Sequence, residues 1–488
     1  MLSRSLIFGL TALVASSALA ADYTLQPNPA DGTATITLQI KGKPSNQFRM
    51  PAWAPGDYEI FNYGQYISDV QFSLKGKSVT GKNEADLNLW TIPEGADTVN
   101  YKVKPSPGNF SPNLRVKERE AFISGPGVLG WFNGHDREAH TLGLKKLTPT
   151  DLCATALAQS DKGDTIALTA TNYDELLDSP TAWGPDIKLH TFTVGGKPHV
   201  VAAYGRNQSV DLPSFETMTT KLITENQKMF GELPYPRYYF MCDFGGGGGG
   251  LEHLNSARLG LWSTNANSSI SFISHEYFHL FNVKRIRPKV LGPFDYTKPA
   301  VNSYLWWLEG VTDYYASVIA YRAGLITRKQ LLNDLGGSAF SIGRNQTALK
   351  YSAAEVSRRV WEGGGSNGFQ GLSYYEKGRV IGLALDLAIR QHSAGKHSLD
   401  SVIVQLFNEC KGSKPGYADG RIRELCIQFG GPKLGPIYDK CVDQPVPMPW
   451  DEVLPGMGLA LSNRSLVEVE NAAPTSTDLR SKWPNLQK

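Results

Sequence analysis

The spacing of hydrophobic and polar positions changes once along this chain of 488 residues. In the first part, short runs such as TATITLQIKG, DVQFSLKG and DTIALTATNY alternate apolar and polar residues. Glycine, proline, asparagine and aspartate separate these runs at short intervals. Alternation with a period of two places every second side chain on the same face of a strand, so we expect an antiparallel β domain over residues 22–185.

The pattern becomes helical after a last predicted hairpin, HTFTVGGKPHVVAAYG, in which Gly195 and Gly196 form the expected turn. The segment LPSFETMTTKLITENQKMFGELP has apolar residues at helical spacing, with Ser214 as the expected N-cap and Gly231 as the expected end. Further helical patterns follow as far as SLDSVIVQLFNECKG. The sequence therefore predicts a β domain followed by a mostly α domain over residues 186–450.

The two ends of the chain differ in composition from the segments between them. Residues 1–20, MLSRSLIFGLTALVASSALA, carry Arg4, an apolar run and a small-residue site before Ala21, which is typical of a secretory signal peptide. No other stretch approaches the length of a membrane span, so the mature chain is expected to be soluble and exported, either periplasmic or secreted. Residues 451–488 are polar and contain proline, which predicts a loosely held tail.

Charge and cysteine content exclude several kinds of function. The formal net charge is +3, and the one basic tract is KRIRPK, which leaves no electrostatic footprint for nucleic acid. No cysteine lies in a C-x-x-C pair, which argues against a zinc site built from cysteines. Export would permit a disulfide among the clustered C-terminal cysteines, but the sequence does not determine a pairing among Cys153, Cys242, Cys410, Cys426 and Cys441.

The stretch SHEYFHLFNVKRIRP holds the first candidate for chemistry. On a helix, His275 and His279 lie one turn apart on the same face, where two imidazoles can bind one zinc ion. Glu276 is offset around the helix, where it can accept a proton from a water on the metal without being a ligand. The alternative is a pair of core histidines with ordinary hydrogen-bond partners.

A third zinc ligand is expected from YLWWLEGVTDYYASV. Glu309 lies early in this strongly apolar segment, where a carboxylate is costly to bury unless it binds a cation. Asp313, one turn further on, is the rival ligand, although we interpret it as orienting a histidine. Glu309 could instead be an ordinary carboxylate at a helix N-terminus. The predicted site holds one zinc ion per chain and keeps one position open for water.

Hydrolysis of an amide also needs a hydrogen-bond donor for the negative charge that develops on the carbonyl oxygen. In SYYEKGRVIGLAL, Tyr375 stands at the head of a predicted helix and is our candidate for that donor. A tyrosine at such a position could equally be a core residue.

Six glycines, Gly245 to Gly250, precede Leu251 and Glu252 in CDFGGGGGGLEHLNS. Glycine lets a backbone pass close to a ligand, whereas a phosphate loop would need a following Lys-Ser or Lys-Thr that is missing here. We expect a strand edge or loop in which Glu252 could hold the α-ammonium group of a substrate. The alternative for Glu252 is an exposed loop acid.

Taken together, these motifs resemble one family. HEYFHLFNVKRIRP, WWLEGVTDYY, GGLEHLNS and SYYEKG occur in the order and approximate spacing of the glycyl aminopeptidases, which are gluzincin metallopeptidases. FRMPAWAPGDYEI is similar to the family's N-terminal β segment, and NYDELLDSP to the passage into its catalytic domain. The resemblance implies an α+β multidomain fold, with an antiparallel β-sandwich followed by a thermolysin-like, mostly α catalytic domain.

The resemblance also implies an activity and a role for each candidate residue. Peptides with a small first residue, glycine or alanine, would lie along the strand edge formed by Gly249, Gly250 and Leu251. The implied roles are zinc ligands for His275, His279 and Glu309, general base for Glu276, oxyanion donor for Tyr375 and amine anchor for Glu252. Two departures from the family pattern are the long glycine run and the short chain after PWDEVLPGMGL, which leaves too little sequence for the family's PDZ-like domain.

Three other functions stay open at this point. The same zinc centre could serve an endopeptidase in which Glu252 is structural, or a hydrolase with a non-peptide substrate. The chain could also be an exported protein that binds zinc or peptide without catalysis, although such a protein needs neither a base nor an oxyanion donor. The sequence leaves the physiological substrate and the oligomeric state undetermined.

Overall fold

Alternating side chains build three sheets in the N-terminal half of the computed structural model. The structure describes residues 21–107, 113–205, 211–244, 248–261, 266–363, 368–412 and 415–486. The largest sheet has the strand order β14 (Ala158–Asp161), β15 (Thr165–Ala170), β12 (His140–Lys145), β1 (Ala21–Asn28), β2 (Thr33–Ile40), β8 (Thr98–Val103), β4 (Ile67–Leu74) and β5 (Lys77–Val79). The β1–β12 pair is parallel and the other pairs in this sheet are antiparallel.

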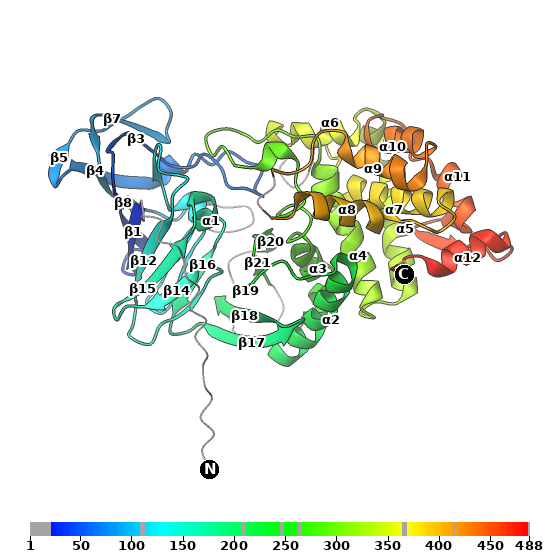
Figure 1. Cartoon of the computed structure of the whole chain (residues 1–488), viewed down its shortest axis with the longest axis horizontal. Helices are drawn as coiled ribbons and strands as arrows, with labels where there is room; N and C mark the ends of the chain where they lie inside the picture. The colour runs from blue at the N-terminus through cyan, green and yellow to red at the C-terminus, as the bar shows by residue number, and fades with distance from the viewer. Residues whose placement is uncertain are drawn as a thin grey trace, which may run out of the picture.

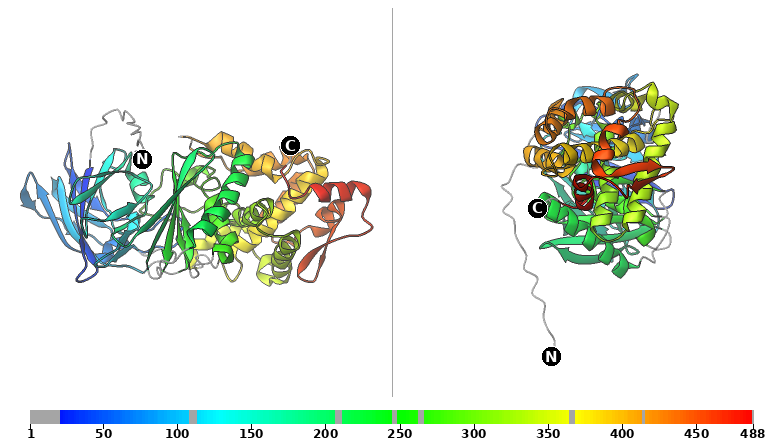
Figure 2. Two further views of the ribbon diagram at one scale, coloured as in Figure 1. Left: turned by 90° about the horizontal axis from the view of Figure 1, so that it is seen from below. Right: turned by 90° about the vertical axis from the view of Figure 1, so that its right-hand side faces the viewer.

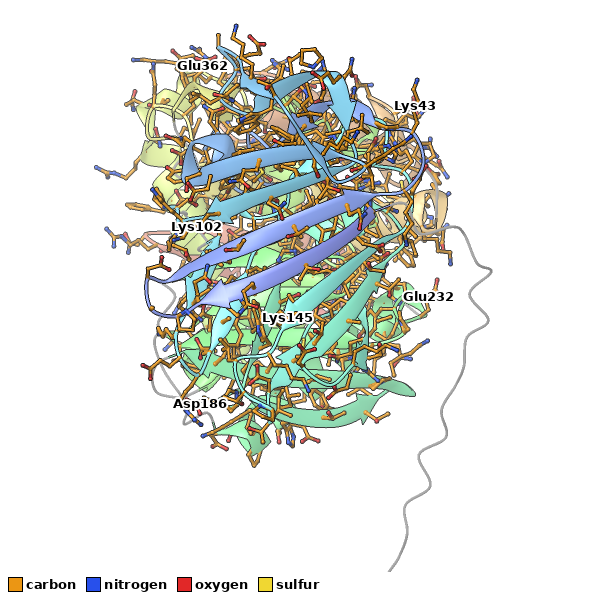
Figure 3. The ribbon with its side chains drawn as sticks, turned by 90° about the vertical axis from the view of Figure 1, so that its left-hand side faces the viewer. Lys43, Lys102, Lys145, Asp186, Glu232 and Glu362 are labelled. Atoms are coloured by element: carbon orange, nitrogen blue, oxygen red, sulfur yellow. The ribbon has the colours of Figure 1, made fainter. Side chains whose placement is uncertain are left out.

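Two smaller four-stranded sheets complete this domain. Their orders are β13 (Leu152–Ala154), β16 (Thr181–Gly184), β10 (Ala121–Ile123), β9 (Leu114–Val116), and β11 (Trp131–Phe132), β3 (Ser45–Arg49), β7 (Leu89–Ala96), β6 (Lys82–Asn83). A short helix, α1 (Tyr173–Leu177), follows the large sheet in the chain. Apolar residues from all three sheets share one core. The outer face of the large sheet carries charged side chains, among them Lys102 and Lys145, which pair with Asp31 and Asp164 (Figure 3).

A five-stranded sheet stands between the β domain and the helices (Figures 1 and 2). Its order is β17 (Lys188–Val194), β18 (Lys197–Gly205), β19 (Tyr238–Phe244), β21 (Ser256–Gly260) and β20 (Gly249–Glu252). The predicted hairpin is present, since β17 and β18 pair on either side of Gly195 and Gly196, both with positive φ. β20 is an edge strand, because no described strand pairs with its outer side.

The rest of the chain is mostly helical and surrounds a second core. The helices are α2 (Leu212–Phe230), α3 (Ile270–Phe278), α4 (Thr312–Arg322), α5 (Arg328–Arg344), α6 (Ala353–Arg358), α7 (Tyr374–His392), α8 (Leu399–Cys410), α9 (Arg421–Gly430), α10 (Leu434–Val442), α11 (Trp450–Val453) and α12 (Pro474–Lys482). A π-helical turn, Trp306–Val311, leads into α4. The predicted fold class, a β-rich domain followed by a helical domain, is confirmed. Among the described residues, no helix combines the length and the apolar character needed to cross a bilayer.

The start of helix α2 differs from the expectation, whereas its end agrees with it. Helix α2 begins one residue after Asp211, whose side chain accepts the Ser214 amide, so Asp211 and not Ser214 is the N-cap. Gly231 ends the helix as predicted, with φ of 80°. All five cysteines are buried and unpaired, so none of the disulfides that the sequence permitted is formed.

The C-terminal segment is packed and not loosely held. A hairpin of β22 (Leu459–Ser462) and β23 (Ser465–Glu468) precedes α12. Gly336 allows the hairpin to pack closely against α5, because a Cβ atom at this position would lie 2.2 Å from the amide nitrogen of Leu466. Trp483 is fully buried, and its indole donates to the Tyr314 hydroxyl at 3.2 Å. Average polarity misled the prediction, since a few buried apolar side chains, among them Leu459, Leu466 and Trp483, hold this segment against the core. The signal-peptide prediction for residues 1–20 lies outside the described residues.

Candidate metal and peptidase site

Helix α3 presents two imidazoles to one point, as the helical spacing predicts. His279 follows the last residue of the helix with helical backbone angles, and its amide donates to the His275 carbonyl at 3.2 Å. The two Nε2 atoms lie 2.9 Å apart, with the ring planes at 90°. Both histidines and the intervening Glu276 are buried, so this end of α3 points into the protein and away from solvent.

The carboxylate of Glu309 meets the two histidines from the π-helical turn before α4. Its Oε2 atom lies 3.2 Å from His279 Nε2 and 3.7 Å from His275 Nε2. The other nitrogen of each ring has its own partner: His275 Nδ1 lies 2.7 Å from Asp313 Oδ1, and His279 Nδ1 lies 2.9 Å from the Asn282 carbonyl. These partners orient both rings so that Nε2 faces Glu309.

The electrostatics of this cluster favour a cation. Burial acts to lower the pKa of His275, but Asp313 and Glu309 outweigh it and raise that pKa well above its usual value. Burial acts to raise the pKa of Glu309, yet His279 and His275 hold it well below its usual range. Two ring nitrogens and a carboxylate oxygen within 4.8 Å of one another, all buried, are a donor set that suits zinc. The predicted ligands therefore fit the metal.

Glu276 lies beside the cluster and against the glycine-rich strand. A Cβ atom at Gly250 would lie 2.1 Å from both the Cδ and the Oε1 atoms of Glu276, so strand β20 passes directly over this carboxylate. Burial raises the pKa of Glu276 to about 7, although His275 and His279 act to lower it. The predicted base and the predicted strand edge are thus in contact, and only glycine at position 250 leaves room for both.

Tyr375 stands in the first turn of α7, whose N-cap Ser373 accepts the Tyr375 amide at 3.2 Å. Its ring centre lies 6.0 Å from that of His275, with the planes at 32°. Burial first, and then the charge of Glu309, raise the pKa of Tyr375 well above its usual value. The hydroxyl therefore keeps its proton at neutral pH and is available as a hydrogen-bond donor.

Glu252 ends strand β20 next to a small cavity of about 30 Å³. The lining includes Gly56 and Tyr58 of the N-terminal domain and Trp361 of the helical domain. A Cβ atom at Gly56 would lie 3.5 Å from Glu252 Oε2, so the N-terminal domain closes one side of this acid. Tyr58 in turn donates to Glu309 Oε1 at 2.7 Å, which links the small cavity to the predicted metal ligand.

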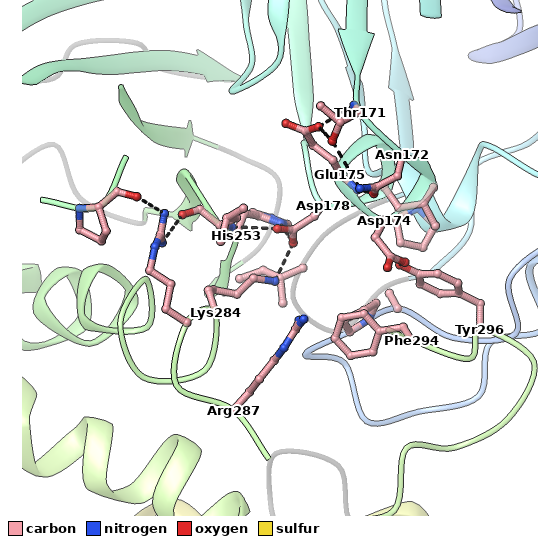
Figure 4. A pocket seen from close by; sticks show the side chains of 18 of the residues that line it. Thr171, Asn172, Asp174, Glu175, Asp178, His253, Lys284, Arg287, Phe294 and Tyr296 are labelled. Atoms are coloured by element: carbon pink, nitrogen blue, oxygen red, sulfur yellow. Dashed lines mark hydrogen bonds and ion pairs between the residues drawn. The ribbon is translucent and has the colours of Figure 1, made fainter. Parts of the chain in front are cut away.

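A larger cavity of about 700 Å³ lies between the two domains, next to the small one (Figure 4). Asp178, half-buried in its wall, accepts from Lys284 at 2.7 Å and from the Leu254 amide at 2.8 Å, and lies 3.1 Å from His253 Nδ1. Burial acts to raise the pKa of Asp178, but Lys284 and His253 hold it well below its usual range. Because residues 253 and 254 follow Glu252 directly, Asp178 anchors the chain that carries Glu252.

Comparison with known families bears on the same segments. The sequence model of the M61 glycyl aminopeptidase family matches residues 268–381. The sequence model of the M61 peptidase N-terminal domain matches residues 22–185. The chain belongs to the M61 glycyl aminopeptidase family. This M61 protein is accordingly a metallo-aminopeptidase. No match was found among curated proteins.

Solved structures support the fold of this M61 peptidase. An aminopeptidase N family protein from Idiomarina loihiensis has a TM-score of 0.82 at 24% identity, over 90% of this chain and 78% of that one. An M1 zinc metallopeptidase variant from Deinococcus radiodurans, bound to Tyr-Ser-Ala, has a TM-score of 0.55 at 13% identity, over 88% and 95% of the two chains. Yeast LTA4 hydrolase in complex with bestatin has a TM-score of 0.54 at 14% identity, over 88% and 68%.

An ion network joins the two domains of the M61 peptidase beneath strand β20. Asp243 of β19 is fully buried, and its Oδ2 atom accepts from Arg115 of β9 and from Arg258 of β21, each at 3.0 Å. Arg258 also donates to the Gly249 carbonyl at 3.3 Å, at the start of β20. The network therefore fixes both the domain interface and the strand that passes over Glu276.

Asp243→Asn is expected to lower the free energy of unfolding by about 3–5 kcal/mol, because the fully buried guanidinium group of Arg258 loses its counter-charge and the half-buried Arg115 keeps only its pair with Glu120. Asp186→Asn is the control, since its pair with Arg119 is at the surface and should matter by less than about 1 kcal/mol. Urea unfolding of both variants measures the difference. Equal midpoints for the two variants would contradict the importance given to the buried network.

The structure thus brings together most of the residues singled out in the sequence. His275, His279 and Glu309 converge, Asp313 contacts a histidine, and Glu276 contacts the glycine strand. Their catalytic roles remain predictions. The sequence motifs assign no role to Tyr58 or Asp178, although both residues lie in the segments FRMPAWAPGDYEI and NYDELLDSP, which resemble the family. No local pattern marks either residue, because each meets its partner only across the domain interface.

Proposed function

We propose that this protein is an exported zinc aminopeptidase that removes a small first residue, glycine or alanine, from peptides. The observation that carries the proposal is the convergence of His275, His279 and Glu309 beside Glu276, with the open edge of β20 passing over that base. Export rests on the N-terminal sequence of residues 1–20, and places the activity in the periplasm or outside the cell.

The chemistry would be hydrolysis of the first peptide bond. One zinc ion per chain, held by the two histidines and Glu309, would polarise the scissile carbonyl and lower the pKa of a water molecule. Glu276 takes the proton from the attacking water and delivers it to the leaving amine. The Tyr375 hydroxyl donates a hydrogen bond to the oxyanion that develops on the carbonyl oxygen.

The peptide would add to the free edge of β20, where Gly249, Gly250 and Leu251 offer backbone groups and little bulk. Glu252 at the end of the strand pairs with the α-ammonium group of the first residue. The cavity beside Glu252, about 30 Å³, has room for about one methyl group or water molecule. This size supports a preference for glycine or alanine over larger first residues.

The test is to measure metal content and turnover on one preparation. We expect one zinc per chain by elemental analysis, with cleavage of free-amine glycyl and alanyl anilides and no cleavage of their N-acetylated forms. Cleavage of both forms would indicate an endopeptidase. Zinc without cleavage of either would indicate a non-peptide substrate or a binding protein.

Glu252→Gln is expected to raise KM for free-amine substrates about thirtyfold, because a charge-assisted hydrogen bond to the ammonium group contributes roughly 2 kcal/mol. The amide keeps the shape of the side chain, so folding and zinc content should not change. Steady-state kinetics with glycyl and alanyl anilides measure the effect. If KM stays within twofold of wild type, Glu252 is not the amine anchor.

A further inference from the structure

A loop of the N-terminal domain reaches into the catalytic domain. It connects β3 with the turn Tyr63–Tyr66 and is fastened to the other domain at residues 52 and 53. The Ala52 amide donates to the Tyr296 carbonyl at 2.8 Å, and the Trp53 indole donates to the Asp295 carbonyl at 3.0 Å. The Trp53 ring also meets Trp361 edge-on, with the centroids 5.4 Å apart. The loop is therefore held by the catalytic domain and not by its own domain alone.

Tyr58 stands at the inner end of this loop in a conformation that is rare for its type. Its φ is 47°, in the left-handed region, where a residue with a side chain stays only if its surroundings hold it there. The rings of Trp361 and Tyr374 pack against it edge-on at 6.2 and 6.1 Å. Tyr58 is 7% exposed. These contacts hold the Tyr58 hydroxyl in a fixed orientation inside the catalytic domain.

The hydroxyl points at the carboxylate of Glu309. The Tyr58 hydroxyl donates to Oε1 at 2.7 Å, while Oε2 is the atom that faces His279 at 3.2 Å. The two oxygens of Glu309 thus have separate partners. A carboxylate oxygen can only accept, so the tyrosine hydroxyl is the donor in this pair.

Each predicted metal ligand has a partner that sets its orientation. Asp313 and the Asn282 carbonyl, both in the catalytic domain, orient His275 and His279. The partner of Glu309 instead comes from the other domain. A carboxylate can rotate or bind a metal through both oxygens, and a hydrogen bond to one oxygen leaves the other as the ligand.

We propose that Tyr58 is a positioning residue of the metal site, whose hydroxyl fixes the orientation of Glu309 so that the N-terminal domain completes the site. This inference rests on the proposed function, because it takes Glu309 as a zinc ligand. The loop also brings Gly56 against Glu252, so the same segment borders the predicted amine subsite. Tyr58 also lines the small cavity beside Glu252, but it acts on the reaction only through its hydrogen bond to Glu309.

The test is Tyr58→Phe, which removes one oxygen atom and keeps the ring contacts. We expect the zinc dissociation constant, measured by competition with a chromophoric chelator, to rise about 10- to 100-fold. The visible absorption bands of the cobalt-substituted protein should shift, because the carboxylate is free to change its binding mode. Activity lost under mild chelation should return with excess zinc. The melting temperature of the metal-free variant should stay close to that of the wild type.

Tyr23→Phe is the matched control, since it removes a buried hydroxyl that donates to the Gly130 carbonyl at 2.8 Å within the N-terminal domain. It should leave zinc affinity and the cobalt spectrum unchanged. All measurements use the folded fraction isolated by size exclusion, so a low yield cannot imitate weak binding. Wild-type zinc affinity and an unchanged cobalt spectrum in Tyr58→Phe would overturn the inference alone. A wild-type protein that binds no zinc would overturn the proposed function as well.

Discussion

Glu276→Gln is expected to retain zinc and to lower kcat by about 10²- to 10⁴-fold, the range associated with loss of a general base. The amide has the shape of the carboxylate but cannot accept a proton from the attacking water. Glu276 is not one of the three converging ligands, so the metal should stay bound. Elemental analysis and anilide turnover on the same preparation measure both effects.

Two further variants serve as comparisons for Glu276→Gln. His275→Ala should lose zinc and activity together, which separates a ligand from a base. Glu225→Gln changes an acid on α2 that pairs with Lys228 far along the chain from the site, and should keep full turnover. Turnover of Glu276→Gln within a few-fold of wild type, in a preparation free of contaminating peptidase, would falsify its role as the base.

Gly250→Ala is expected to lower kcat/KM by about 100-fold, through a single added methyl group. That methyl would lie 2.1 Å from the Glu276 carboxylate, so either the base or strand β20 has to move. A displacement of about 1 Å at a reacting group costs about 100-fold in rate. Zinc content should remain at the wild-type value, because the three atoms nearest to the added methyl group all belong to Glu276 and not to a predicted ligand. Kinetics with a free-amine alanyl anilide, together with elemental analysis, measure the outcome.

Gly343→Ala is the control for this substitution. Gly343 lies in α5 with no atom within 4 Å of an added Cβ, so alanine there should leave activity unchanged and slightly stabilise the helix. If Gly250→Ala is as active as Gly343→Ala, then β20 is free to shift away from Glu276. The narrow contact between base and strand would then have no part in catalysis.

Much of the fold and of the predicted metal site follows from short-range pattern. His275, Glu276 and His279 share the end of one helix, so helical spacing alone places two imidazoles on one face. Glu309 was recognisable because a lone acid in an apolar segment is costly to bury without a cation. The hairpin at Gly195 and Gly196 and the helix end at Gly231 were likewise readable, since these glycines adopt positive φ.

Two expectations from the sequence were wrong, one about a helix start and one about the C-terminal segment. The Asp211 cap was missed because Ser214 is also a capping residue, and the choice between them depends on where the helix begins. The C-terminal segment was expected to be loose because its average polarity hides a few deeply buried side chains, among them Leu466 and Trp483. Neither the exact start of a helix nor the burial of a particular side chain can be read from local composition.

The sequence by itself determined the order of the domains, the helix that carries two imidazoles and an acid, and the membership of a peptidase family. Only the tertiary structure decided that Tyr58 meets Glu309, that Asp178 anchors the chain after Glu252, and that Gly250 lies on Glu276. The reason is physical. Periodicity and turn preference act over a few residues, whereas these contacts join segments that become neighbours only when two separately packed cores meet.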